Sequence, residues 1–382
     1  MTLLKDIVQI EKGKKYNLLE ENQEGAIRVF QANDFRNENK PLYTLDSDGV
    51  LAQEDDIMLV WDGSVGQMGF GRSGYVGSTM VKLKVKNKKQ FSPFFIYRFL
   101  QTKSDYLKRK ATGATIMHIN RKSLEQLEIP DLDIDDQLRI ANLLSKAENL
   151  IAQRKESIRL LDEFLKSTFL EMFGDPSTNS KGWKELTLKD VCLKIQDGTH
   201  FSPPIISEGI PYITAKHVRE NKVDFWANPW FISEESHRDI YKRCNPVKGD
   251  VLYIKDGATT GYAAINPYDF EFSMLSSLAL LKPKKGITNS EYLCAWLNNP
   301  NAKRSILTKM AGGAIKRLTL TKINALPILL PPIAIQTQFA QIVEKTEALK
   351  TQYQQSLQEL EHLYGSLSQR AFRGELKMKQ NV

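Results

Sequence analysis

Residues 137–173 read QLRIANLLSKAENLIAQRKESIRLLDEFLKSTFLEMF, and residues 336–372 read QTQFAQIVEKTEALKTQYQQSLQELEHLYGSLSQRAF. A shift of 199 positions relates the two stretches. It aligns 110–173 with 309–372 without a gap and gives 16 identical pairs among 64. Weaker similarity continues upstream in a shifted register. The chain is therefore interpreted as two copies of one unit, each a divergent block followed by a better-preserved segment.

Both preserved segments have the periodicity of long helices. Apolar residues recur at spacings of four and three over about five heptads without an intervening proline. Each segment follows a proline-containing stretch and ends near a glycine, Gly174 or Gly374. The predicted seam consists of Leu144, Ile151, Ile158, Leu161, Leu165, Val343, Leu357, Leu360 and Leu367. Such a seam needs a partner, so we expect the helices to pair as an antiparallel coiled coil. The alternative is that each helix packs on its own block.

The divergent blocks have an α/β pattern. Strand-like runs occur at Asp56–Trp61, Gly77–Val85, Val251–Lys255 and Leu275–Leu281, and short helical patterns occur at Pro93–Lys110 and Ser290–Lys309. The predicted fold class is α+β, with two α/β domains alternating with two long helices in a pseudo-two-fold repeat. The predicted boundaries are 1–130, 131–175, 176–328 and 329–376.

Positive charge is concentrated in two blocks of the 382-residue chain, whose net charge is +8. Residues Lys82–Lys122 contain 12 Lys/Arg and one acid, and Lys282–Lys322 contain nine and one. Two such blocks at matching places indicate binding to a polyanion, and the alternative is two solvated surfaces. The candidate DNA-binding residues are Lys82, Lys84, Lys86, Lys108, Arg109, Lys110, Lys282, Lys284, Lys285, Lys316 and Arg317.

Motifs for catalysis are lacking. No GxxxxGK[ST] loop occurs, and the five histidines have no metal-ligand spacing. Asn228-Pro229 and Asn266-Pro267 resemble part of an amino-methyltransferase motif, but without its second proline they are interpreted as turns. We therefore predict no catalytic residue and no metal site.

The cysteine pattern and the hydropathy indicate in which cellular compartment the protein is expected. Three cysteines are spread along the chain without a CxxC motif, which favours a reducing environment. The longest uncharged apolar run is Ile323–Ile335, which is short and contains three prolines. We expect a cytoplasmic protein without a membrane partner.

Two sets of residues stand out around the ends of the predicted helices. The first is Ile129-Pro130, Asp136–Ile140 and Leu144–Glu148, and the second is Leu330–Ile333, Gln336–Phe339 and the terminal Ala371–Leu376. In these residues the chain resembles the first and second constant regions of a known family, the DNA-specificity subunits of type I restriction-modification enzymes. One departure is Asp131-Leu132-Asp133, where the family usually has Leu-Pro-Pro.

The resemblance implies a non-catalytic subunit whose divergent blocks are target-recognition domains. Such a subunit binds double-stranded DNA and two modification (methyltransferase) subunits, and the assembly also contains restriction/translocase subunits. S-adenosylmethionine would belong to the modification subunit, and ATP and Mg to the restriction subunit. Because the blocks diverge, the expected target is an asymmetric pair of separated half-sites. The alternatives are a fused restriction/methyltransferase enzyme with two recognition heads and a coiled-coil scaffold without a DNA role.

Overall fold

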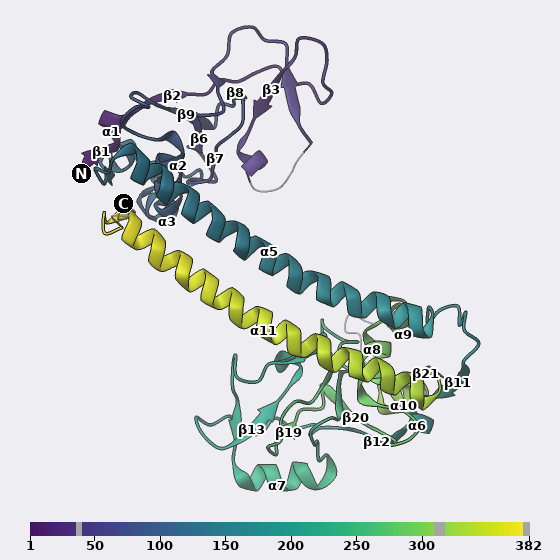
Figure 1. The fold of residues 1–382 in the computed structure, drawn as a ribbon. Helices are drawn as coiled ribbons and strands as arrows, with labels where there is room; N and C mark the ends of the chain where they lie inside the picture. The colour runs from purple at the N-terminus through teal and green to yellow at the C-terminus, as the bar shows by residue number, and fades with distance from the viewer. Residues whose placement is uncertain (36–39, 309–317, 377–382) are drawn as a thin grey trace, which may run out of the picture. The chain divides into compact units, whose positions relative to one another are not determined.

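The structure is a computed structural model that describes residues 1–35, 40–308 and 318–376 (Figure 1). The chain forms two compact units. Unit 1 contains Met1–Lys155 and Gln355–Val382, and unit 2 contains Glu156–Gln354. Each unit therefore combines one α/β head with segments of both long helices. Head 1 denotes residues 2–129 and head 2 denotes residues 184–330.

The described residues of head 1 form three small sheets. Their strand orders are β2-β9-β6-β7, β4-β3-β8-β5 and β1-β10. The elements are β1 Thr2–Leu3, α1 Leu4–Ile7, β2 Val8–Lys12, β3 Ile27–Phe30, the 3-10 helix η1 Ala32–Phe35, β4 Leu42–Thr44, β5 Leu51–Ala52, β6 Ile57–Val60, β7 Met68–Gly69, β8 Gly74–Val76, β9 Met80–Val85, α2 Pro93–Thr102, α3 Ser104–Lys110, α4 Arg121–Glu125 and β10 Glu128–Ile129.

Head 2 has the corresponding sheets, with orders β12-β20-β17-β18, β16-β13-β19 and β11-β21, and an additional hairpin β14-β15. Its elements are β11 Lys184–Thr187, α6 Leu188–Val191, β12 Cys192–Asp197, β13 Ile210–Ile213, the 3-10 helix η2 Ala215–His217, β14 Val218–Arg219, β15 Lys222–Val223, β16 Phe231–Ile232, α7 Glu234–Arg243, β17 Val251–Ile254, β18 Ala263–Ile265, β19 Ser273–Met274, β20 Leu278–Pro283, α8 Ser290–Asn298, α9 Pro300–Thr308, α10 Leu320–Asn324 and β21 Pro327–Leu330.

The strand pairing shows that the two heads are copies of one framework. In head 1, β3 pairs with β8 in parallel and with β4 in antiparallel fashion. In head 2, β13 pairs with β19 and β16 in the same two ways. The central strands β6 and β17 are fully buried, as expected for continuous apolar runs covered on both faces. The predicted α+β class and the internal repeat are confirmed.

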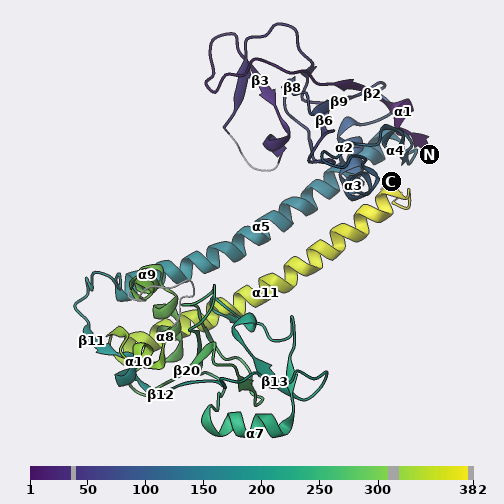
Figure 2. The same ribbon diagram turned by 180° about the vertical axis from the view of Figure 1, so that it is seen from behind.

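The two predicted long helices are present as α5, Ile134–Phe173, and α11, Ile333–Phe372, each with 40 residues. In unit 1, Tyr364 donates to Glu148 at 2.6 Å, and Lys155 pairs with Glu361 at 2.8 Å. In each unit, residues later in α5 contact residues earlier in α11. The two segments are therefore antiparallel, as predicted (Figures 1 and 2).

The role of the predicted seam residues stays a prediction, and the structure gives their burial. Leu144 is buried in the core of head 1. The other eight seam residues are half-buried. In unit 2, Lys350 of α11 pairs with Asp162 of α5 at 2.5 Å. This contact between the two helices is consistent with a role in register, since a polar group on a seam specifies alignment.

A glutamine near the start of each long helix fastens that helix to its own head. Gln137 is fully buried, accepts from the Ser92 amide at 2.9 Å and donates to the Gln90 carbonyl at 2.8 Å. Its repeat counterpart, Gln336, accepts from Asn289 and donates to Ile287 at 3.0 Å. Both amide ends are satisfied in a buried position, which explains why this residue is identical in the two copies.

The opposite end of each long helix completes the head of the other repeat. Phe372, at the end of α11, packs in the core of head 1 against Phe95 and Phe99, with both ring centroids at 5.4 Å. Phe173, its counterpart at the end of α5, lies in the core of head 2 at 4.7 Å from the ring of Tyr292. Each helix therefore packs on its own block, as in the alternative, and also on the head of the other repeat.

Two further observations concern the whole described part of the chain. Cys192, Cys244 and Cys294 are buried free thiols. Within the described ranges, no helix combines the length and the apolar character needed to cross a membrane. The boundaries proposed at 130/131, 175/176 and 328/329 stay a prediction.

Candidate nucleic-acid interface

Of the candidate lysines of head 1, Lys82 and Lys84 lie in β9 and Lys86 directly follows it, and two of the three have partners within the fold. Lys82 pairs with Glu11 at 2.7 Å and donates to the Leu51 carbonyl at 3.1 Å. Lys86 donates to the Lys5 carbonyl in the short helix α1 at 2.7 Å. Lys84 is exposed. Of the three, Lys84 is therefore the side chain most accessible to a ligand.

In head 2 the corresponding lysines have similar structural contacts. Lys282 forms a largely buried ion pair with Asp250 at 2.6 Å. Lys284 donates to the Asp190 carbonyl in α6 at 2.7 Å, which is similar to the contact of Lys86 with α1. Lys285 is exposed. Sequence spacing did not reveal these partners, because they come from residues about 30 and 90 positions away.

The remaining candidates differ in what the structure shows of them. Lys108, Arg109 and Lys110 are exposed in the last turn of α3, where cations also favour the helix dipole. Lys108 pairs with Asp105 one turn earlier at 3.1 Å. Lys316 and Arg317 lie outside the described residues. A DNA-binding role for each of these residues stays a prediction.

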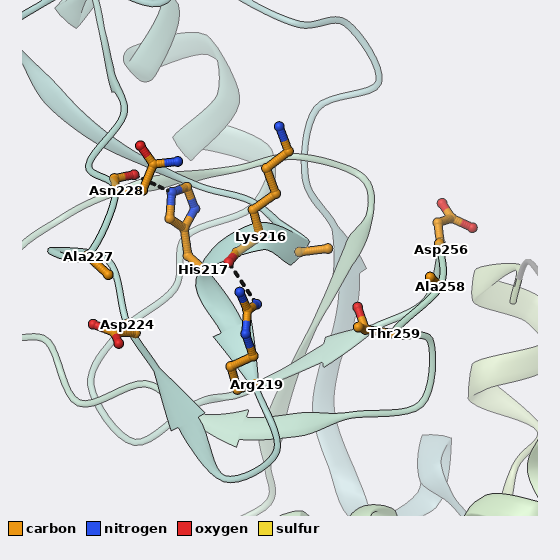
Figure 3. A pocket seen from close by; sticks show the side chains of 11 residues that line it. Lys216, His217, Arg219, Asp224, Ala227, Asn228, Asp256, Ala258 and Thr259 are labelled. Atoms are coloured by element: carbon orange, nitrogen blue, oxygen red, sulfur yellow. Dashed lines mark hydrogen bonds between the residues drawn. The ribbon is translucent and has the colours of Figure 1, made fainter. Parts of the chain in front are cut away.

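Head 2 contains a cavity of about 650 Å³ that sequence analysis did not identify (Figure 3). One wall runs from η2 through the β14–β15 hairpin to the turn that follows it, and the other is the loop after β17. The lining residues are Ala215, Lys216, His217, Arg219, Asp224, Ala227, Asn228, Asp256, Gly257, Ala258 and Thr259. The Asn228-Pro229 turn was the one available signal, and Asn228 does lie in a turn, donating to the Phe225 carbonyl at 3.3 Å.

The ion pairs around this cavity leave its cations without carboxylate partners. Asp224 pairs with Lys222 at 2.9 Å, and Asp256 pairs with the buried Lys255 at 3.2 Å. Lys216 lies over the Trp230 ring at 4.6 Å. Arg219 donates to the carbonyls of Lys216 and Val218. In the part of the chain that the structure describes, no carboxylate pairs with Lys216 or Arg219, so this wall favours an anionic ligand.

His217 holds the cavity wall together from inside. Its Nδ1 accepts from the Thr214 amide at 3.0 Å, and its Nε2 therefore carries the proton and donates to the Asn228 carbonyl at 2.9 Å. Burial lowers the pKa of His217 below its usual value. The neutral imidazole thus fixes the segment between Thr214 and Asn228.

Acidification is expected to destabilise head 2 through His217. Its pKa is lowered by folding, so the unfolded state binds the proton more tightly. Stability is full above the unfolded pKa of about 6.5 and falls as pH drops below it. Fluorescence-detected unfolding of the full chain should show a lower midpoint at pH 5.5 than at pH 7.5, with a smaller drop in His217→Gln. Equal pH dependence in both proteins would contradict this role.

Comparison with known proteins places this arrangement in a family. The family model described as the type I restriction modification DNA specificity domain matches residues 2–160 and again 180–362. The specificity subunit of the type I restriction enzyme MjaVIII of Methanocaldococcus jannaschii is 29% identical over 217 residues, covering 53% of this chain. The MjaIX specificity subunit of the same organism is 23% identical over 306 residues, covering 75% of this chain and 69% of that protein. The match to the MjaVIII subunit spans half of that relative's length.

Solved structures show the same fold. The S subunit of a type I restriction-modification system from M. genitalium superposes with a TM-score of 0.61 at 17% identity, covering 97% of this chain and 95% of that one. A chain from work on complex assembly and conformational transition of the type I R-M system superposes with a TM-score of 0.59 at 16% identity, covering 98% and 97%. The family model matches this chain twice, and the two matches together cover most of the chain. This chain therefore belongs to the family of type I restriction-modification DNA specificity subunits.

Proposed function

We propose that this chain is the DNA-binding subunit that reads two separated half-sites of an asymmetric target, one with each head. The observation that carries the proposal is the repetition of one strand framework in two heads whose loops differ. Two copies of a framework place two reading surfaces, while different loops give different base preferences. Membership of a family of specificity subunits supports this role.

The same proposal includes docking of two modification subunits and, through the assembly, of restriction/translocase subunits. In unit 2, Leu160 and Phe164 lie one turn apart on α5, and each is 49% exposed. Large apolar side chains at this spacing form a stripe suited to a protein partner. We propose that the chain itself catalyses no reaction. S-adenosylmethionine, ATP and Mg would then belong to the partner subunits.

Phosphate contacts should make DNA binding depend on the exposed cations of head 1. In the complex with modification subunits, the combined change Lys84→Ala, Arg109→Ala and Lys110→Ala should weaken binding to all duplexes. Each lost phosphate contact should flatten the slope of log affinity against log salt by about 0.9. Filter binding at several salt concentrations measures the slope, with Lys88→Ala, whose lysine pairs with Asp55, as the control. An unchanged slope would show that this face is only solvated.

Two assays separate the proposal from its rivals. Incubation of the isolated chain with labelled methyl donor and DNA should transfer no label, whereas a fused methyltransferase would label the DNA. A gel shift of the complex at low salt should retard duplex DNA, whereas a scaffold without a DNA role would leave it unshifted. Transfer by the chain alone, or absence of a shift, would contradict the proposed function.

A further inference from the structure

We propose that the head 2 cavity lined by Lys216, Arg219 and Asn228 is a base-reading site for one half-site of duplex DNA. The proposal rests on the proposed function and assigns residues to it. Lys216 and Arg219 would hold phosphates, and Asn228 would read a base edge. Thr259 lies on the opposite wall of the cavity.

The charge and polarity of the lining match a duplex. The two carboxylates of the cavity are neutralised by Lys222 and Lys255, whereas Lys216 and Arg219 are not paired with any described carboxylate. Asn228 is exposed, and an asparagine carboxamide can pair with the major-groove edge of adenine in bidentate fashion. Ala215, Ala227 and Ala258 add small apolar surface, which suits contact with a thymine methyl group.

The wall that carries these side chains is rigidly supported. Asn221 adopts a left-handed conformation, with φ of 59°, in the connection between β14 and β15. Its amide donates to the Ala263 carbonyl at 2.9 Å, and its side-chain oxygen accepts from Asn298 of α8 at 2.6 Å. His217 joins the other end of the segment to Asn228. Reading a base edge requires side chains held in place by such supporting contacts.

Comparison of the two heads shows where their reading surfaces diverge. The Gln31 amide donates to Asp34 at 2.7 Å in head 1, and the Thr214 amide donates to His217 at 3.0 Å in head 2. The strand registers make these two turns equivalent. Within this turn, Asn33 of head 1 occupies the position that Lys216 occupies in head 2. The backbone frame is thus kept while the side chain at the cavity changes, so head 2 presents a cation for a phosphate where head 1 presents an amide.

A selection experiment tests the assignment. The complex with modification subunits would be used to enrich sequences from a randomised duplex library. Wild type should enrich a two-part sequence. Asn228→Ala should lose about tenfold of its discrimination at base pairs in one part and keep the other part unchanged. Lys216→Ala should weaken binding to all duplexes several-fold, whereas Lys242→Ala, which changes an exposed lysine of α7 that is not part of the lining, should not.

The outcomes separate this inference from the proposed function. If wild type enriches no sequence, the proposed function fails. If wild type enriches a two-part sequence and Asn228→Ala keeps both parts, the cavity is not a base-reading site. Thermal unfolding of each variant should match wild type. A variant that unfolds early is replaced by Asn228→Asp, which keeps the shape, removes the amide donor and should shift the preferred base.

Discussion

Phe372→Ala is expected to destabilise head 1 by about 3–5 kcal/mol, the usual cost of removing a buried phenylalanine ring. The ring is 9% exposed and packs on Phe95 and Phe99 of α2, although it belongs to the helix of the second repeat. Its removal leaves a cavity in a core that sequence position alone would assign to residues 1–130. Hydrogen exchange of the full chain should show faster exchange in β6 and β9 than in wild type.

Phe173→Ala is the matched control, because Phe173 occupies the equivalent position in head 2 at 5.3 Å from the ring of Phe339. This variant should accelerate exchange in β17 and β20 and leave head 1 protected. Each change should therefore loosen the head of the other repeat. If either variant loosened the head of its own repeat instead, the completion of each head by the opposite helix would be wrong.

A chain that ends at Thr178 is expected to form a dimer. This half contains head 1 and all of α5, but it lacks Phe372, so the core of head 1 is incomplete. Phe173 of a second copy can take that position, since Phe173 and Phe372 are an identical pair in the repeat. Both copies would gain the same contact, which favours a closed two-fold dimer. Sedimentation should give twice the monomer mass, and Phe173→Ala should shift the half-chain toward monomer.

Recognition by that dimer should change in a defined way. Its two heads would be identical, so the asymmetric target should be replaced by a palindrome built from the half-site of head 1. Because α5 is retained, the gap between half-sites should stay close to that of the parent. The measurement is methylation mapping in cells that co-express the half-chain with the modification subunit. A monomeric half-chain, or methylation at the parent site, would contradict the two-unit interpretation.

The features that could be predicted from the sequence are those that leave a periodic pattern along the chain or occur in both repeats. The heptad pattern located α5 and α11, and the Gln137/Gln336 identity reflects a contact made in both heads. The partners of Lys82 and Lys282 could not be predicted, because Glu11 and Asp250 are brought to them by strand pairing across long loops. The cavity was missed for the same reason, since its two walls are about 30 residues apart in the chain.

In the proposed function, the two heads read different halves of one DNA target. The most direct test is genome-wide mapping of methylated adenines in cells that express this chain together with its modification subunit. We expect one asymmetric sequence of two short parts, separated by a gap of fixed length and unspecified bases. Methylation at a single continuous sequence, or the same sites when this chain is omitted, would contradict it.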